Sequence, residues 1–237
     1  MIQRLRKSLN WKYAIGEVVL IFIGITLAMW FNNWNEDRKD RKLEQQYLID
    51  VHQDLLNDTS SLNLVLKLIN GHIISAENIL AYMDSDILVD TFDMLRDFQN
   101  AGFLYFYNAD LSTYNDLVNS GNLRVVQDKK LKDMLSDYVS RIKQIDERYE
   151  LNKKFVWYDY GLHMSQYFDG RLRAAPNDER REALKKYPVS WQQLRRDTEL
   201  KRKLTMVISG GSAETRWHSN LRTFLQELIT YLESLIK

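Results

Sequence analysis

An apolar run near the N-terminus constrains this chain more than any other part of its sequence. The run covers 19 residues beginning at Tyr13, and Glu17 is the one charged side chain within it. At 1.5 Å per residue, a helix of this length spans about 28 Å, close to the ~30 Å hydrocarbon core of a bilayer. Tyr13 on one side, and Trp30 and Trp34 on the other, stand where interfacial aromatic anchors belong. The sequence therefore predicts a single transmembrane helix over residues 13–34.

The first twelve residues predict which side of the membrane each end occupies. They are basic and contain no acid, which is typical of a cytoplasmic N-terminus. The apolar run lacks the small-x-small pattern that signal peptidase needs, so we expect an uncleaved signal anchor. Residues 35–237 would then form a domain in the periplasm, anchored in the inner (cytoplasmic) membrane. The opposite orientation stays open, because four basic residues, Arg38, Lys39, Arg41 and Lys42, also follow the helix.

Small residues recur along one stripe of the predicted transmembrane helix. Gly24 and Ala28 form a small-xxx-small pair that allows close approach of a second helix. Glu17 lies beside this stripe, where it could serve oligomer contact or an ion path, or could extend to the nearby interface. The candidate transmembrane contact therefore comprises Gly16, Glu17, Leu20, Gly24 and Ala28.

Two sequence blocks resemble a known family. The first is YAIGE at residues 13–17, followed by Gly24 in the apolar run and by NNWNE at residues 32–36. The second is TYNDL at residues 113–117, followed by SGNL at residues 120–123 and by Leu131.

These blocks are similar to those of a family of uncharacterised Bacteroidetes membrane proteins, the domain of unknown function 6090. The resemblance covers roughly the first half of the chain, and it implies a single-pass membrane protein with an α-helical domain. It implies no activity. Met29 and Trp30 stand where the resemblance leads us to expect aliphatic or Gln residues. This departure affects only the polar character of the last transmembrane turn.

Composition favours an all-α fold and excludes several classes of site. The 237 residues include two prolines and nine glycines, so turn signals between strands are nearly missing. There is no cysteine, which excludes disulfides and thiolate metal sites. A net charge of +1 argues against a dedicated nucleic-acid binder.

Beyond the membrane, residues 36–83 predict a long stalk helix that continues the transmembrane helix. Apolar residues follow a three–four alternation, which Asp58 and His72 interrupt. The stripe indicates the core face of a bundle, with a parallel coiled coil between subunits as the alternative. Its members are Leu48, Val51, Leu55, Leu62, Val65, Ile69, Ile79 and Met83.

Shorter elements are expected next. Residues 87–100 predict a second helix, and residues 103–107 form an aromatic segment that we expect to pack in the core, with a partner or membrane-surface patch as the alternative. Ser112 is the expected N-cap of a helix over residues 113–119, and Gly121 its C′ residue.

Two more long helices complete the predicted bundle. Asp128 is expected to cap a helix that extends to Phe168 and lies antiparallel to the stalk helix, and aromatic residues gather on several sides of its end. An irregular crossover over residues 169–190 contains a helical turn at 180–186. The last helix carries a heptad stripe, and the glycine pair at 210–211 before it predicts a kink, a break or close packing. The stripe comprises Trp217, Leu221, Phe224, Leu228, Tyr231 and Leu235.

No catalytic or metal-binding motif stands out. The four histidines are scattered without ligand spacing, and Ser140 with Lys143 matches Ser-x-x-Lys without the other elements of such a site. Basic residues between 171 and 203 alternate with acids, which favours a solvated face over an anion-binding surface. We therefore expect no enzyme, cofactor or small-molecule substrate.

The sequence predicts an all-α protein in which an N-terminal transmembrane helix continues into a long-helix antiparallel bundle. The expected function is a membrane-anchored scaffold or interaction protein of the cell envelope. We expect it to self-associate as a homo-oligomer through its transmembrane and stalk helices, or to join an envelope complex. A helical-bundle sensor or ligand-binding module, and a small oligomeric channel around Glu17, are the alternatives.

Overall fold

A computed structural model describes residues 11–85, 91–174, 176, 179–186 and 189–236. Residues 1–10, which carry most of the basic N-terminal segment, lie outside the described residues, as do residues 86–90 at the expected start of the second helix. All regular structure in the described part of the chain is helical, and this confirms the all-α fold.

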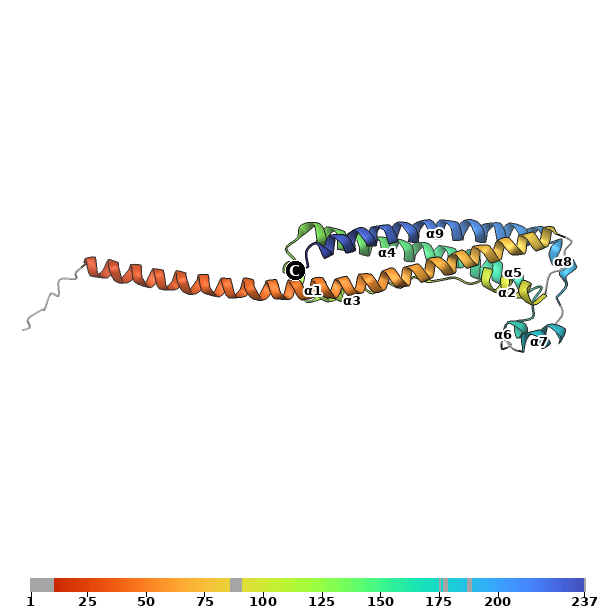
Figure 1. The fold of residues 1–237 in the computed structure, drawn as a ribbon, viewed down its shortest axis with the longest axis horizontal. Coiled ribbons are helices and arrows are strands. Elements are labelled where there is room, and N and C mark those ends of the chain that lie inside the picture. Colours follow the sequence, from red (N-terminus) through yellow and green to blue (C-terminus); the bar gives the residue numbers. More distant parts are fainter. Residues whose placement is uncertain (1–10, 86–90, 175, 177–178, 187–188, 237) are drawn as a thin grey trace, which may run out of the picture.

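The first helix, α1 (Trp11–Asp84), is 74 residues long and unbroken. It is about 110 Å long at the usual rise per residue. Its N-terminal part projects alone beyond the rest of the molecule, whereas its C-terminal part lies along the bundle (Figure 1). The prediction that the apolar segment continues directly into the stalk helix is therefore confirmed. We call the end of the bundle nearer residues 13–34 proximal and the opposite end distal.

The last helix, α9 (Thr198–Glu233), runs antiparallel to α1. Gln45 donates to the backbone carbonyl of Leu235 at the proximal end, and Lys201 pairs with Asp84 at the distal end. The N-cap of α9 is Asp197, whose carboxylate accepts the Leu200 N–H at 2.9 Å. This pairing supports the predicted antiparallel bundle.

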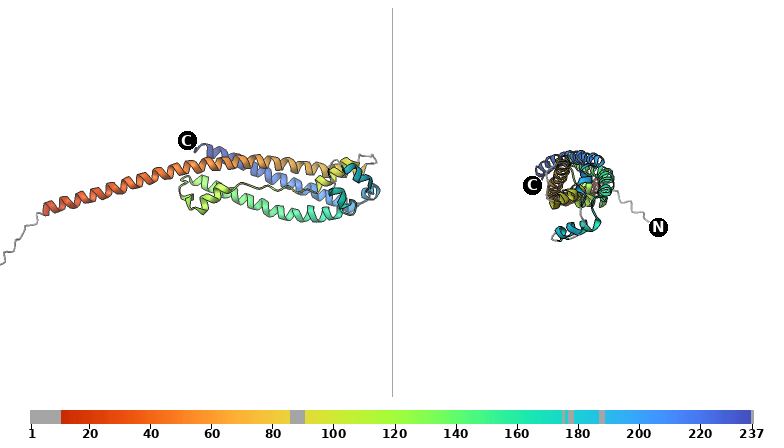
Figure 2. Two further views of the ribbon diagram at one scale, coloured as in Figure 1. Left: turned by 90° about the horizontal axis from the view of Figure 1, so that it is seen from below. Right: turned by 90° about the vertical axis from the view of Figure 1, so that its right-hand side faces the viewer.

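The third long helix, α4 (Lys129–Lys153), is antiparallel to α9 but runs in the same direction as α1, contrary to our expectation for that pair. Contacts to α1 advance in the same direction along α1 and along the chain that leads into α4. Asp40 pairs with Arg124 and Glu44 accepts the Gln127 N–H just before α4, and Asp58 accepts from Tyr138 within it. The reason is the irregular stretch over residues 102–111, which returns the chain to the proximal end before α4 begins (Figure 2).

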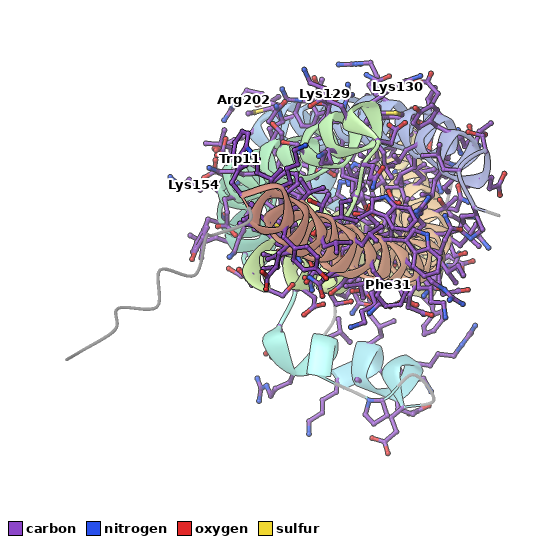
Figure 3. The ribbon with its side chains drawn as sticks, turned by 90° about the vertical axis from the view of Figure 1, so that its left-hand side faces the viewer. Trp11, Phe31, Lys129, Lys130, Lys154 and Arg202 are labelled. Atoms are coloured by element: carbon purple, nitrogen blue, oxygen red, sulfur yellow. The ribbon has the colours of Figure 1, made fainter. Side chains whose placement is uncertain are left out.

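Short helices connect these long ones. They are α2 (Thr91–Ala101), α3 (Ser112–Asn119), the 3₁₀ helix η1 (Asn122–Arg124), the π-helix η2 (Lys154–Tyr160), α5 (Gly161–Met164), α6 (Gly170–Ala174), α7 (Arg180–Lys186) and α8 (Trp191–Arg195). The turn predicted over residues 180–186 is α7. Seen along the long axis, α6 and α7 stand to one side of the bundle (Figure 3).

Two local predictions about α3 had different outcomes. Ser112 is the first helical residue rather than the N-cap. Its backbone N–H donates to Asp110, and that of Thr113 donates to Asp54, so neighbouring carboxylates satisfy the helix start. Gly121 follows the C-cap residue with φ of 73°, and this confirms it as the C′ residue.

The helix predicted to reach Phe168 changes its winding. The α-helical part ends at Lys153, and residues 154–160 continue as a π-helix before the short α5. Asp128 caps α4 as predicted, because its carboxylate accepts the Leu131 N–H at 2.7 Å. The aromatic-rich end of the predicted helix is therefore wound differently from α4, and it lies at the distal end of the bundle.

Among the described residues, the core consists of two apolar clusters. All eight residues of the predicted stripe on α1 are buried in one or the other, so this stripe packs inside a single chain's bundle. The aromatic segment 103–107 is only partly core: Tyr107 is buried, while Phe103 and Phe106 are exposed.

Candidate functional site

The apolar part of α1 is uncovered along its whole length. No residue of its most apolar 18-residue window is buried, and within the described chain α1 is the one helix long and apolar enough to cross a membrane. Burial in lipid would remove this large apolar surface from water. The predicted interfacial anchors are also exposed, Tyr13 by 80%, Trp30 by 65% and Trp34 by 45%.

The predicted transmembrane contact residues all lie on this uncovered surface. Glu17, Leu20 and Ala28 are exposed, and a side chain added at Gly16 or Gly24 would meet no atom within 4 Å. The described part of a single chain thus brings none of them into contact with another element, and their role in association stays a prediction.

Between the two apolar clusters the bundle contains a polar layer, formed by His72, Asn152, Glu214 and His218. The Asn152 side chain donates to Glu214 at 2.7 Å, and His72 Nδ1 lies 3.2 Å from the Asn100 carbonyl. Burial raises the pKa of Glu214 and lowers the pKa of both histidines. Each of these groups is therefore held toward its neutral form.

A second polar group joins three elements nearer the proximal end. Tyr138 on α4 donates to Asp58 on α1, and its hydroxyl lies 3.1 Å from that of Tyr107. The Asp110 N–H donates to the other Asp58 oxygen at 2.8 Å. Burial raises the pKa of Asp58, although both hydrogen bonds counter that effect. The apparent break that Asp58 makes in the stripe is therefore a hydrogen-bonded core position.

A third buried carboxylate, Asp97 on α2, fixes that helix to α1. It accepts hydrogen bonds from Ser75, Asn78 and Tyr82 at 3.1–3.2 Å. Because these three donors lie on successive turns of α1, they set the position of α2 along it.

A cavity of about 540 Å³ opens at the distal end, between α2, η2 and α5. Its wall is mainly apolar, and the Tyr160 hydroxyl beside it is already engaged, since it donates to the Phe98 carbonyl at 3.1 Å. The volume falls within the range of small-molecule pockets, and the lining suits an apolar or aromatic group. The apolar lining residues are Leu95, Phe98, Tyr160, Leu162, Met164 and Phe168.

The π-helix η2 supplies Tyr158 and Tyr160 to the wall of the cavity. π-helical turns often occur at functional sites. The next residue along the chain, Gly161, lines the cavity together with Gly102. Sequence reasoning identified this aromatic segment but not the cavity, because the irregular winding has no clear pattern in the residues.

No metal-binding cluster of three or more His, Asp or Glu residues occurs in the described parts of the chain. His163 contacts Asp197 at 2.5 Å, and Tyr167 donates to the same carboxylate oxygen at 2.7 Å. Asp197 is also the N-cap of α9, so this group anchors the start of α9 to the end of α5.

The basic stretch is interleaved with acids, as predicted. Lys203 lies 3.3 Å and Arg202 3.8 Å from Glu199, and Lys201 pairs with Asp84. These pairs support the interpretation of a solvated, mixed-charge face.

Comparison with known proteins identifies a family. The model of a family of unknown function (DUF6090) matches residues 17–159, more than half of the chain. The matched segment runs from the apolar part of α1 to η2, and it ends before the crossover and α9. No curated protein and no solved structure matches the chain.

Proposed function

The chain belongs to the DUF6090 family of unknown function, and we propose that it is a membrane-anchored, non-catalytic scaffold or interaction protein of the cell envelope. The observation that carries this proposal is the division of α1. One continuous helix has an uncovered apolar end and, at its other end, forms the core of a folded bundle. Such a helix anchors the bundle and directs its distal end away from the bilayer.

The proposal includes a topology. The N-terminus lies in the cytoplasm, and the bundle lies in the periplasm beyond the inner membrane. Fusion of alkaline phosphatase to the C-terminus tests this directly. Activity in cells supports the topology, and an inactive but stably produced fusion contradicts it.

We also propose that copies associate through the stripe beside Glu17 rather than through the stalk helix. The apolar stripe of the stalk helix is used within each chain's own bundle, whereas Gly16 and Gly24 are uncovered. Close approach of two helices at such small residues is a common mode of association in lipid.

The mass of the detergent-solubilised particle, with whatever co-purifies, tests the scaffold role. An oligomer or a stable complex supports it, and a lone monomer contradicts it. Gly24→Leu places a bulky group on the stripe and should reduce the particle mass if the stripe forms the contact. Val18→Leu, on the other side of the helix, is the matched control.

The distal cavity favours a second candidate function, a ligand-binding module. Ligand-observed NMR with naphthalene tests whether the full-length protein binds an aromatic group there. Ser165→Trp, at the cavity wall, should abolish binding, whereas Ser136→Trp on the exposed side of α4 should not. Equal binding by both variants would contradict this candidate.

A further inference from the structure

A groove on α1 lies just beyond the uncovered apolar segment. It is shallow and lined by Trp34, Arg38, Arg41, Lys42 and Gln45. At about 100° per residue, these positions fall within an arc of about 100° on one face of the helix. The three cations are exposed, and the Arg38 guanidinium lies over the Trp34 ring, 6.0 Å from its centroid. We call this face the basic groove.

Four acids lie on the same turns, and none forms an ion pair with the basic groove in the described part of the chain. Glu36 accepts from the Asn32 side chain at 3.3 Å, and Asp37 is exposed one turn before Arg41. Asp40 pairs with Arg124 at 3.1 Å, and Glu44 accepts the Gln127 N–H at 2.7 Å. Asp40 and Glu44 are therefore engaged by the chain's own loop before α4.

The cations of the basic groove have no such partner. In the described part of the chain, no carboxylate lies within salt-bridge distance of Arg38, Arg41 or Lys42. Arg41 makes one weak contact, in which Nε donates to the Asp37 carbonyl at 3.4 Å. Three positive charges are consequently left for a ligand from outside the chain.

Depth along α1 identifies that ligand. With Trp34 at the membrane interface, Arg38 lies about 6 Å and Lys42 about 12 Å further along the helix axis. The headgroup layer on each side of a bilayer is roughly 5–8 Å thick. Long basic side chains extend back toward it, and an arginine guanidinium can bind a phosphate through two parallel hydrogen bonds.

We propose that the basic groove binds the phosphate headgroups of anionic phospholipids, with Arg38 and Arg41 on the phosphate and Lys42 adding charge. This inference rests on the proposed membrane anchoring. Lipid bound on this face would fix the depth of α1 in the bilayer and the rotation of the whole chain about the helix axis.

The test uses the full-length protein in vesicles of phosphatidylcholine, with and without phosphatidylglycerol. After gentle detergent extraction, native mass spectrometry counts the lipid molecules retained on each chain. We expect several-fold preference for phosphatidylglycerol. The variant R38Q/R41Q/K42Q should lose it, whereas the control K39Q/K143Q/K154Q, which removes the same charge elsewhere, should keep it.

Retention of the preference by R38Q/R41Q/K42Q, or its loss in the control, would overturn the inference. So would the absence of any preference in the unaltered protein. Carbonate extraction of the same vesicles separates this result from a failure of anchoring: a chain that resists extraction but shows no lipid preference contradicts only the basic groove, and a chain that is extracted contradicts the proposed function as well.

Discussion

The Tyr138 hydroxyl on α4 donates a hydrogen bond to the buried carboxylate of Asp58 on α1. This contact links two helices that run in the same direction and that otherwise associate mainly through α9. Asp58 is 2% exposed and also accepts the Asp110 N–H, so it joins α1 to α4 and to the returning segment. The position of three elements thus depends on one carboxylate.

Tyr138→Phe should lower the free energy of unfolding by about 1–3 kcal/mol. The substitution leaves one Asp58 oxygen and the Tyr107 hydroxyl without their partner, and unsatisfied buried polar groups carry a cost of this size. Urea denaturation followed by circular dichroism measures the change. Tyr149→Phe is the matched control, since Tyr149 is only partly buried, and it should change the stability by less than about 0.5 kcal/mol. Equal effects of the two substitutions would contradict this role of Tyr138.

Asp58 should also make stability depend on pH. Because burial raises the native pKa of Asp58, the native state binds more protons than the unfolded state between the ordinary value near 4 and the raised value. Its contribution is then largest at low pH and decreases as pH rises through that window. The difference in unfolding free energy between the unaltered protein and Asp58→Asn, measured across that range, should follow this trend. An increase with pH would contradict it.

The sequence was sufficient to predict the uncovered apolar segment, the continuous first helix and the apolar core positions along it. These features have a strong period, and a period determines which face is buried. Asp58 and His72 lie at the spacing of the stripe but are polar, so their burial could be predicted only from the apolar positions around them. The partners that satisfy them, Tyr138 and the Asn100 carbonyl, are distant in sequence and carry no local pattern.

The last helix shows the limits of a heptad assignment. Leu221 and Leu228 are buried as predicted, but Trp217, Phe224 and Tyr231 lie at the edge of the core. Cations of α4 stack on these three rings, with Arg148, Arg141 and Lys130 at 4.1–4.3 Å from the ring centroids. The core positions on α9 instead follow Gly211, Glu214, His218, Leu221, Leu225, Leu228 and Leu232. Glu214 and His218 interrupt the apolar pattern of this series, so the series could not be recognised from the sequence.

Removal of the apolar segment should leave the bundle folded. Within the described part of the chain, residues 11–34 make no buried contact with other elements, so a chain that begins at residue 35 loses only uncovered apolar surface. We expect this chain to leave the membrane fraction and to show an unfolding transition close to that of the full-length protein in detergent. Circular dichroism and fractionation measure both. Loss of the transition would show that the segment contributes to the bundle itself.

Asp197 should have a pH dependence opposite to that of Asp58. Burial acts to raise the pKa of Asp197, but the Leu200 N–H, His163 and Tyr167 outweigh it and hold the pKa below its ordinary value. Its contribution to stability is therefore present above the unfolded pKa and is lost as pH falls through the lower native pKa. Asp197→Asn should cancel this acid-dependent part, whereas Asp133→Asn at an exposed position should not. An unchanged acid profile for Asp197→Asn would contradict the assignment.

Adjacent glycines in α9 should respond in opposite directions to alanine. A Cβ at Gly211 would lie 2.8 Å from Ile73 Cγ1 on α1, whereas at Gly210 the nearest atom is 3.9 Å away. Gly210→Ala should stabilise the protein by about 0.5–1 kcal/mol, because alanine is the better helix former. Gly211→Ala gains the same propensity but must displace Ile73, and overpacking of this kind costs roughly 1–3 kcal/mol. In an Ile73→Ala background, which lacks Cγ1, Gly211→Ala should cost less than in the unaltered protein. Equal stabilisation by both alanine substitutions would show that α1 and α9 do not approach closely at Gly211.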